Sequence, residues 1–204
     1  MKNHLIVACL LLLITAPARS QQQGRREISG YGGGVDERAA ARVLYWNMKE
    51  DIPAGQFVFD YGRPVWNQKY EDPAKFDAMT KGKVWRMGNN FWTLLDTSLP
   101  LKISGKNVSV GYYYLGLRRS QDGAEWSLAF IDPAKVRLAR LDGFVIDEAT
   151  VEFEAPVSVE KNAAITEKLT ITLTYTEDAP TKVIMRLAWG NLLVTAPIEA
   201  SLLP

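Results

Sequence analysis

Two short polar and aromatic blocks hold the side chains best suited to binding an anion. One block, Tyr61-Gly62-Arg63-Pro64, contains Arg63, and the other, residues 81–90, contains Arg86. Guanidinium groups bind carboxylates and phosphates through two parallel hydrogen bonds. The two blocks therefore predict a ligand-binding cluster with these candidate members: Arg63, Lys83, Trp85, Arg86 and Asn90.

Each candidate could instead have a purely structural role, and the sequence leaves both the ligand-binding and the structural interpretation open. An arginine could instead bond carboxylates or backbone carbonyls and brace the corner of a sheet. We favour this role for Arg86 and ligand binding for Arg63, because Pro64 fixes a loop-like exit beside it. Trp85 could stack on a ligand, but a tryptophan on a strand more often packs into a core. Asn90 suits a turn with positive φ.

Further candidates concern sugars. Three aromatic side chains could form a flat platform for sugar rings, or could pack against a sheet: Trp66, Tyr70 and Trp92. Four carboxylates lie in or beside predicted strands: Asp60, Asp96, Glu125 and Asp132. Two acids at a defined separation are sufficient for glycoside hydrolysis. The sequence alone does not give the distances between these four.

Cys9 and His4 are the only cysteine and histidine in the chain, and both precede a predicted cleavage site. The processed chain therefore lacks Cys nucleophiles, Ser-His-Asp triads, thiolate or imidazole zinc sites and histidine pH switches. No calcium-binding loop and no Gly-x-Ser-x-Gly elbow occurs in the sequence. We expect no metal and no cofactor, assign no catalytic residue, and favour a non-enzymatic role.

Residues 1–20 have the pattern of a signal peptide. A short basic start precedes an apolar run from Leu5 to Ala16, and small residues then allow cleavage near Ala18 or Ser20. The run is too short for a membrane anchor, which needs about 20 apolar residues, and Cys9 lies too close to the basic end for a typical lipoprotein. We expect a periplasmic or secreted protein without a membrane span.

Loss of Lys2 and Arg19 with the leader leaves 22 basic and 23 acidic residues. This near-neutral balance argues against nucleic acid as a partner. Residues 21–34 are polar and rich in glycine, which predicts a flexible linker rather than a phosphate-binding loop. Residues 35–204 are then expected to form a single domain.

Alternating apolar residues predict strands in most of that domain. Residues 57–61, 126–130, 169–175 and 183–189 each alternate, and Gly- and Asp-containing turns separate them. Apolar spacing after Asp36 predicts one helix over residues 37–48. Tyr112 and Tyr114 share a strand face with Val108 and Val110, which predicts a core position for both tyrosines. The expected fold is an all-β, jelly-roll-like antiparallel β-sandwich with one short N-terminal helix.

The chain resembles the domain of unknown function 2911 family, a group of exported bacterial proteins. The resemblance rests on the YGRP step, the GKVWRMGNN block, the LKISGKNV hairpin with its following GYY strand, and the closing LAWGNLLVTAPI segment. It covers residues 56–198 and implies a β-rich exported domain of no established activity. Two features depart from the family pattern: Phe91 stands where Glu is usual, and residues 66–73 replace a short K-G-R step, which places Trp66, Tyr70 and Phe76 on an expected surface loop.

Three functions remain open at this point. The first is a non-catalytic module that binds a small molecule, a glycan or an envelope protein. The second is a carboxylate-dependent hydrolase acting on glycans. The third is a purely structural envelope protein. Paired carboxylates in one cleft would favour hydrolysis, and an exposed aromatic strip without such a pair would favour sugar binding.

Overall fold

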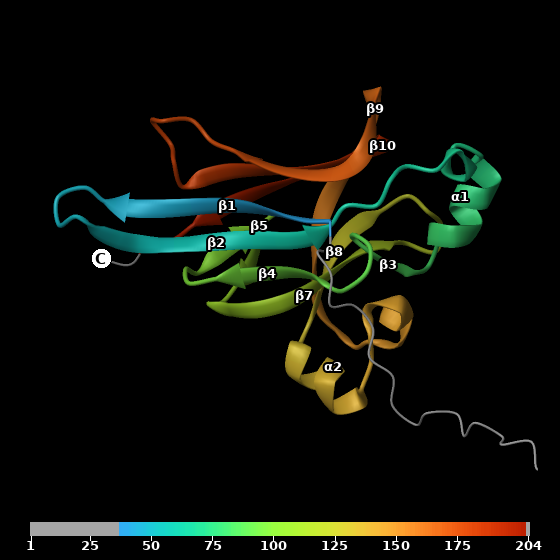
Figure 1. The fold of residues 1–204 in the computed structure, drawn as a ribbon, viewed down its shortest axis with the longest axis horizontal. Helices are drawn as coiled ribbons and strands as arrows, with labels where there is room; N and C mark the ends of the chain where they lie inside the picture. The colour runs from blue at the N-terminus through green and yellow to red at the C-terminus, as the bar shows by residue number, and fades with distance from the viewer. Residues whose placement is uncertain (1–36, 203–204) are drawn as a thin grey trace, which may run out of the picture. The chain divides into compact units, whose positions relative to one another are not determined.

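Antiparallel strands follow one another through a sheet that curls back on itself (Figure 1). The structure, a computed structural model, describes residues 37–202. The strands within that range are β1 (Arg38–Asn47), β2 (Ile52–Gly62), β3 (Val84–Arg86), β4 (Thr93–Thr97), β5 (Leu101–Ile103), β6 (Lys106–Val108), β7 (Gly111–Arg119), β8 (Trp126–Ile131), β9 (Val151–Thr174) and β10 (Lys182–Ala200). The order is β1-β2-β4-β7-β8-β9-β10-β5-β6, and β3 pairs with β7.

The strands form two layers, one that contains β8 and one that contains β10, and the long strand β9 belongs to both. Its residues 151–157 pair with β8, and its residues 158–174 pair with β10. A strand that changes sheets in this way turns a corner between two packed layers. The prediction of an all-β antiparallel fold is confirmed.

The segment after β2 joins the two layers a second time. The Trp66 amide donates to the Glu167 carbonyl at 2.6 Å, and the Leu169 amide donates to the Pro64 carbonyl at 3.1 Å. Val65 forms an antiparallel bridge with Lys168 between these two bonds. Residues 64–66 therefore close the sheet against β9.

The core lies between the two layers and contains the apolar residues of the predicted alternating segments. Phe57 and Phe59 of β2 are fully buried, and β10 buries its whole apolar series from Val183 to Trp189. In β9, Leu169 and Ile171 are buried and Thr172 and Thr174 are exposed, as the alternation predicts, whereas Thr170 and Leu173 are half-buried. The period-2 pattern placed these side chains correctly because one face of each strand meets the core.

The predicted helix over residues 37–48 is wrong, because this segment forms strand β1. Val43 and Tyr45 are buried while Leu44 and Trp46 are exposed, which is the two-residue period of a strand. Backbone pairing with β2 over its whole length overrides the local preference of the alanine-rich start for a helix.

The predicted core position of Tyr112 is also wrong. Its side chain is 44% exposed, and Val110 on the same predicted face is exposed as well. The alternation that starts at Val108 does not continue into β7, because residues 109–110 belong to no strand and separate β6 from β7. Tyr113 takes the core-facing position instead and packs edge-on against Phe130. Tyr114 stacks on Trp92 in a smaller hydrophobic cluster outside the main core.

Two short helices follow Asp-Pro steps that were not predicted as helix starts. Helix α1 (Pro73–Thr80) is capped by Asp72, and α2 (Pro133–Ala139) is capped by Asp132. Proline is well suited to the first helical position because its missing N–H would be unpaired there anyway. Two 3-10 helices, η1 (Gln68–Tyr70) and η2 (Gly143–Glu148), complete the helical parts of residues 37–202.

The expected signal peptide and linker, residues 1–20 and 21–34, lie outside the described residues. No helix between residues 37 and 202 is long and apolar enough to cross a membrane.

Candidate ligand-binding groove

The YGRP block bonds to β9 at three of its four residues. The Tyr61 hydroxyl donates to the Ile171 carbonyl at 3.3 Å and accepts from the Ile171 amide at 2.9 Å. Arg63 donates from Nε to the Leu169 carbonyl and from Nη2 to Thr170 Oγ1, both at 3.2 Å. The Pro64 carbonyl accepts from the Leu169 amide. Arg63, the residue predicted to await a ligand, therefore braces the closure of the sheet.

The second block is also held by internal contacts. Arg86 donates from Nη1 to the Asn90 carbonyl at 2.8 Å and lies over the Phe144 ring of η2. Burial lowers the pKa of Arg86, and the nearby Asp142 carboxylate partly opposes that shift. Asn90 has a φ of 63°, the positive-φ turn that the sequence suggested. The Lys83 ammonium donates to the Ala78 carbonyl at 3.1 Å.

The five predicted ligand-binding residues contact different parts of the fold. Arg63 contacts β9, whereas Arg86 contacts the Asn90 turn and η2. Trp85 stacks on Trp189 of β10 with ring centroids 5.1 Å apart. The bracing interpretation accounts for the contacts of both arginines.

The predicted three-ring platform requires correction, because only two of its rings meet. Trp66 and Tyr70 have centroids 5.3 Å apart, and both pack on Trp189. Trp92 is stacked on Tyr114 in the other hydrophobic cluster. The inserted segment is likewise not an exposed loop. It forms η1 and α1, which turn Tyr70 and Phe76 inward.

Three of the four candidate carboxylates have other positions or partners. Asp60 accepts from Arg38 Nε at 2.7 Å, and Asp132 accepts from the Ala134 amide at the start of α2. Asp96 is exposed on β4. Only Glu125 lines a large hollow, a groove of about 1040 Å³.

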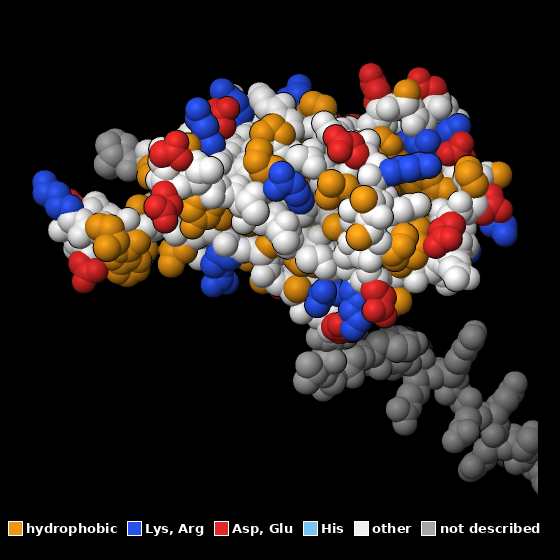
Figure 2. Space-filling view, turned by 90° about the horizontal axis from the view of Figure 1, so that it is seen from above, with side chains coloured by type: hydrophobic (Ala, Val, Ile, Leu, Met, Phe, Trp, Pro, Cys, Tyr) orange, Lys and Arg blue, Asp and Glu red, His pale blue; other side chains and the backbone are white. Residues whose placement is uncertain are grey.

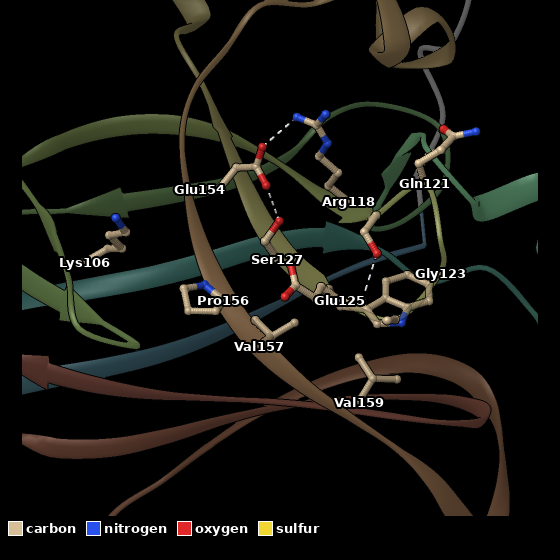
Figure 3. A pocket seen from close by; sticks show the side chains of 13 residues that line it. Lys106, Arg118, Gln121, Gly123, Glu125, Ser127, Glu154, Pro156, Val157 and Val159 are labelled. Atoms are coloured by element: carbon tan, nitrogen blue, oxygen red, sulfur yellow. Dashed lines mark hydrogen bonds and ion pairs between the residues drawn. The ribbon is translucent and has the colours of Figure 1, made fainter.

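This groove lies along β8 and the first part of β9 (Figure 3). The end of β7 and the turn over residues 120–124 form one side, and Lys106 reaches it from β6. The residues that line it are Lys106, Arg118, Ser120, Gln121, Gly123, Ala124, Glu125, Trp126, Ser127, Glu154, Pro156, Val157 and Val159.

Glu154 is fixed in the groove through both of its oxygens. Arg118 donates from Nη1 to Glu154 Oε1 at 2.7 Å, and the Ser127 hydroxyl donates to Glu154 Oε2 (Figure 3). These contacts fix the position of the carboxylate, which presents a rigid polar surface in the groove.

Other polar side chains in the groove have no intramolecular partner and can contact a ligand. Between residues 37 and 202, the side chains of Lys106, Gln121 and Glu125 line the groove and make no hydrogen bond or ion pair. Trp126 also lines the groove, half-buried, with the Arg119 guanidinium over its ring at 5.2 Å. The groove therefore offers an ammonium, an amide, a carboxylate and an aromatic edge.

Sequence reasoning identified Glu125 and missed Arg118 and Glu154. Arg118 is paired directly with Ser127 across β7 and β8, and Glu154 is on the next strand over. The side chains of Arg118, Ser127 and Glu154 come together because of the register in which the three strands pair. Neither the composition nor the spacing of residues along the chain reveals that register.

Comparison with curated proteins and with solved structures finds no match to either. One family model, described as a protein of unknown function (DUF2911), matches residues 47–198. The matched range holds both blocks and all strands from β2 to β9. This match covers most of the chain, and the chain belongs to the DUF2911 family.

Proposed function

We propose that this chain is an exported, non-catalytic binding domain whose groove along β8 and β9 holds a segment of an oligosaccharide. The observation that carries the proposal is the lining of the groove, where the side chains of Lys106, Gln121 and Glu125 have no intramolecular partner among the described residues. Sugars present many hydroxyl groups, each able to donate and accept. A surface with free donors and acceptors of both charges complements them better than a surface of one sign.

The surface charge agrees with a neutral ligand. Figure 2 shows acidic and basic side chains interspersed, with hydrophobic side chains between them, on the face seen from above. Such a face creates no extended field of one sign to attract a polyanion.

Export is the second part of the proposal and rests on the predicted leader. The processed protein would begin near Gln21 and be periplasmic or secreted. The mass of the protein recovered from the cell envelope or medium tests this. An intact Met1 or a lipid on Cys9 would contradict it.

The glycan proposal is tested by screening the processed protein on a glycan array and titrating the best ligand by calorimetry. Glu125→Gln should weaken binding about tenfold, the scale of one hydrogen bond to a charged group. The control is Glu177→Gln, an exposed residue in the turn between β9 and β10. It should bind as the unmodified protein does. Failure to bind any glycan, or equal affinity in both variants, would overturn the proposal.

One observation favours a second candidate, because Glu125 and Glu154 both line the groove. A carboxylate-dependent glycan hydrolase would use such a pair. Assaying the bound glycan for new reducing ends separates the two candidates. Product release that Glu125→Gln abolishes would replace binding by hydrolysis.

A further inference from the structure

A second hollow, with a different lining from the groove, lies between α1 and strands β7 to β10. It has a volume of about 350 Å³, which is within the usual range for small-ligand pockets. Residues of η1 and α1 line one side of it. The end of β7, the start of β8, and parts of β9 and β10 line the other side. The segment that departs from the family pattern, residues 66–73, therefore contributes to one wall of this hollow.

Aromatic rings form the apolar part of this lining. Phe76 of α1 and Trp126 of β8 have ring centroids 6.2 Å apart. Tyr70 of η1 is held by packing on Trp189, with centroids 5.0 Å apart. The buried side chain of Leu192 adds an aliphatic surface. Rings pack well edge-on or offset against other rings, so this lining favours an aromatic ligand.

Arg119 brings a fixed positive charge to the same lining. Its guanidinium lies over the rings of Phe76 and Trp126, at 5.6 and 5.2 Å from their centroids. It donates from Nε to the Gly123 carbonyl at 2.9 Å and from Nη1 to Asp77 Oδ1 at 2.6 Å. Nη2 donates no hydrogen bond within residues 37–202. The guanidinium is thus held in place and keeps one amino group for a ligand.

Strand register places a second cation on the same side. Lys161 of β9 lies opposite Leu192 of β10. Paired residues of antiparallel strands have their side chains on the same face, and Leu192 lines the hollow, so the Lys161 side chain faces it too. The neighbouring Glu160 lies opposite Leu193, so its side chain points to the other face. The Lys161 ammonium makes no hydrogen bond or ion pair within residues 37–202.

The two carboxylates on the α1 side of the hollow already have partners. Asp77 pairs with two cations, Arg119 at 2.6 Å and Lys81 at 2.8 Å. Glu71 accepts a hydrogen bond from Trp66 Nε1 at 3.2 Å. The charge that the hollow offers to a ligand is therefore positive.

We infer that this hollow binds a small aromatic carboxylate, a molecule with one ring and one anionic group such as 3-phenylpropionate. The ring packs among the aromatic side chains beside α1. The carboxylate accepts hydrogen bonds from the Lys161 ammonium and from Arg119 Nη2. The site is separate from the proposed oligosaccharide groove, because neither Lys161 nor Arg119 lines the groove and Glu125 does not line the hollow.

Calorimetric titration of the folded protein with three probes tests the ring and the charge separately. 3-Phenylpropionate should bind saturably. Phenethylamine carries the same ring with the opposite charge, and propionate carries the carboxylate without the ring. Each of these two should bind at least about tenfold more weakly than 3-phenylpropionate.

A matched pair of substitutions locates the site. Lys161→Gln removes the ammonium and should weaken the binding of 3-phenylpropionate about tenfold. Lys49→Gln makes the same change in the turn between β1 and β2 and should leave the affinity unchanged. Both lysines are exposed, and melting temperatures establish that both variants are folded.

Three results would overturn the inference. The first is the absence of saturable binding of 3-phenylpropionate. The second is phenethylamine or propionate binding as tightly as 3-phenylpropionate, which would remove the role of the charge or of the ring. The third is equal affinity in the two lysine variants, which would place the ligand elsewhere. None of these bears on the groove, whose test variant, Glu125→Gln, should bind 3-phenylpropionate as the unmodified protein does.

Discussion

Gly190 occupies a position where no other residue fits. Its φ is +58°, and an added Cβ would lie 2.0 Å from Cδ2 of Trp66. Gly105 also has positive φ, at +83°, but nothing lies within 4 Å of its Cβ position. Gly105→Ala should therefore cost only the backbone term of about 1–2 kcal/mol. Gly190→Ala should cost about 1–3 kcal/mol more from overpacking, measured by urea unfolding. Equal losses would show that Trp66 moves aside freely.

Tyr45 couples stability to alkaline pH. Burial, with a smaller contribution from Tyr175, raises the pKa of Tyr45 from 10.0 to about 12. The folded state keeps the hydroxyl proton where the unfolded state has lost it, so the stabilising contribution is complete below pH 10 and is lost as pH rises toward 12.

Tyr45→Phe should make the unfolding free energy less dependent on pH across that alkaline range, as measured by urea unfolding at several pH values. The variant also loses the hydrogen bond from Tyr45 to the Pro180 carbonyl, and this loss should appear equally at about pH 7. An unchanged alkaline slope would mean that Tyr45 ionises as easily in the folded protein as in the unfolded chain.

At the scale of single residues, the sequence indicates which residues matter but not what they contact. The YGRP and GKVWR blocks were identified, and Arg63 was interpreted as a ligand-binding residue. Its partners, the Leu169 carbonyl and the Thr170 hydroxyl, are more than a hundred residues away along the chain. Only the fold brings these groups together, so the residue types alone could not distinguish a brace from a site.

Strand β9 shows how much an element-level pattern can predict. Ile171 is 4% exposed and belongs to the core, whereas Thr172 is exposed. Ile171→Ala should cost about 2–5 kcal/mol, as truncations in a packed core do. Thr172→Ala should change stability by about 0.5 kcal/mol or less. Thermal or urea unfolding of both variants measures this, and comparable losses would show that β9 is buried on both faces.

Strand β1 marks the limit of such patterns. The β1 segment contains three alanines followed by a run of apolar residues, so its sequence fits both a helix and a strand. Pairing with a strand elsewhere in the chain decides between the two. The neighbouring strand β2 supplies that pairing from Arg38 to Asn47. The helices α1 and α2 could have been found from their Asp-Pro steps, because each Asp caps the helix that its Pro begins.

The whole molecule depends on two connections between its layers, one through β9 itself and one through residues 64–66. The Arg63 side chain donates to β9 beside the second connection. The backbone amides of Trp66 and Leu169 form the hydrogen bonds of that connection itself. The groove along β8 is lined by β9 residues on both sides of the corner, Glu154 and Val159 among them. Movement at the closure would therefore reach the candidate groove.

Arg63→Ala should lower the free energy of unfolding by about 1.5–3 kcal/mol, the scale of hydrogen bonds made by a charged group. The side chain of Arg42 in β1 is exposed and has no partner among residues 37–202, so Arg42→Ala should change stability by no more than about 0.5 kcal/mol. Amide hydrogen exchange then separates local from global effects. If Arg63 secures the closure, the amides of Trp66 and Leu169 should lose more protection than the amides that pair β7 with β8. A uniform loss would make Arg63 an ordinary stabilising residue, and no loss would return it to the list of ligand-binding candidates.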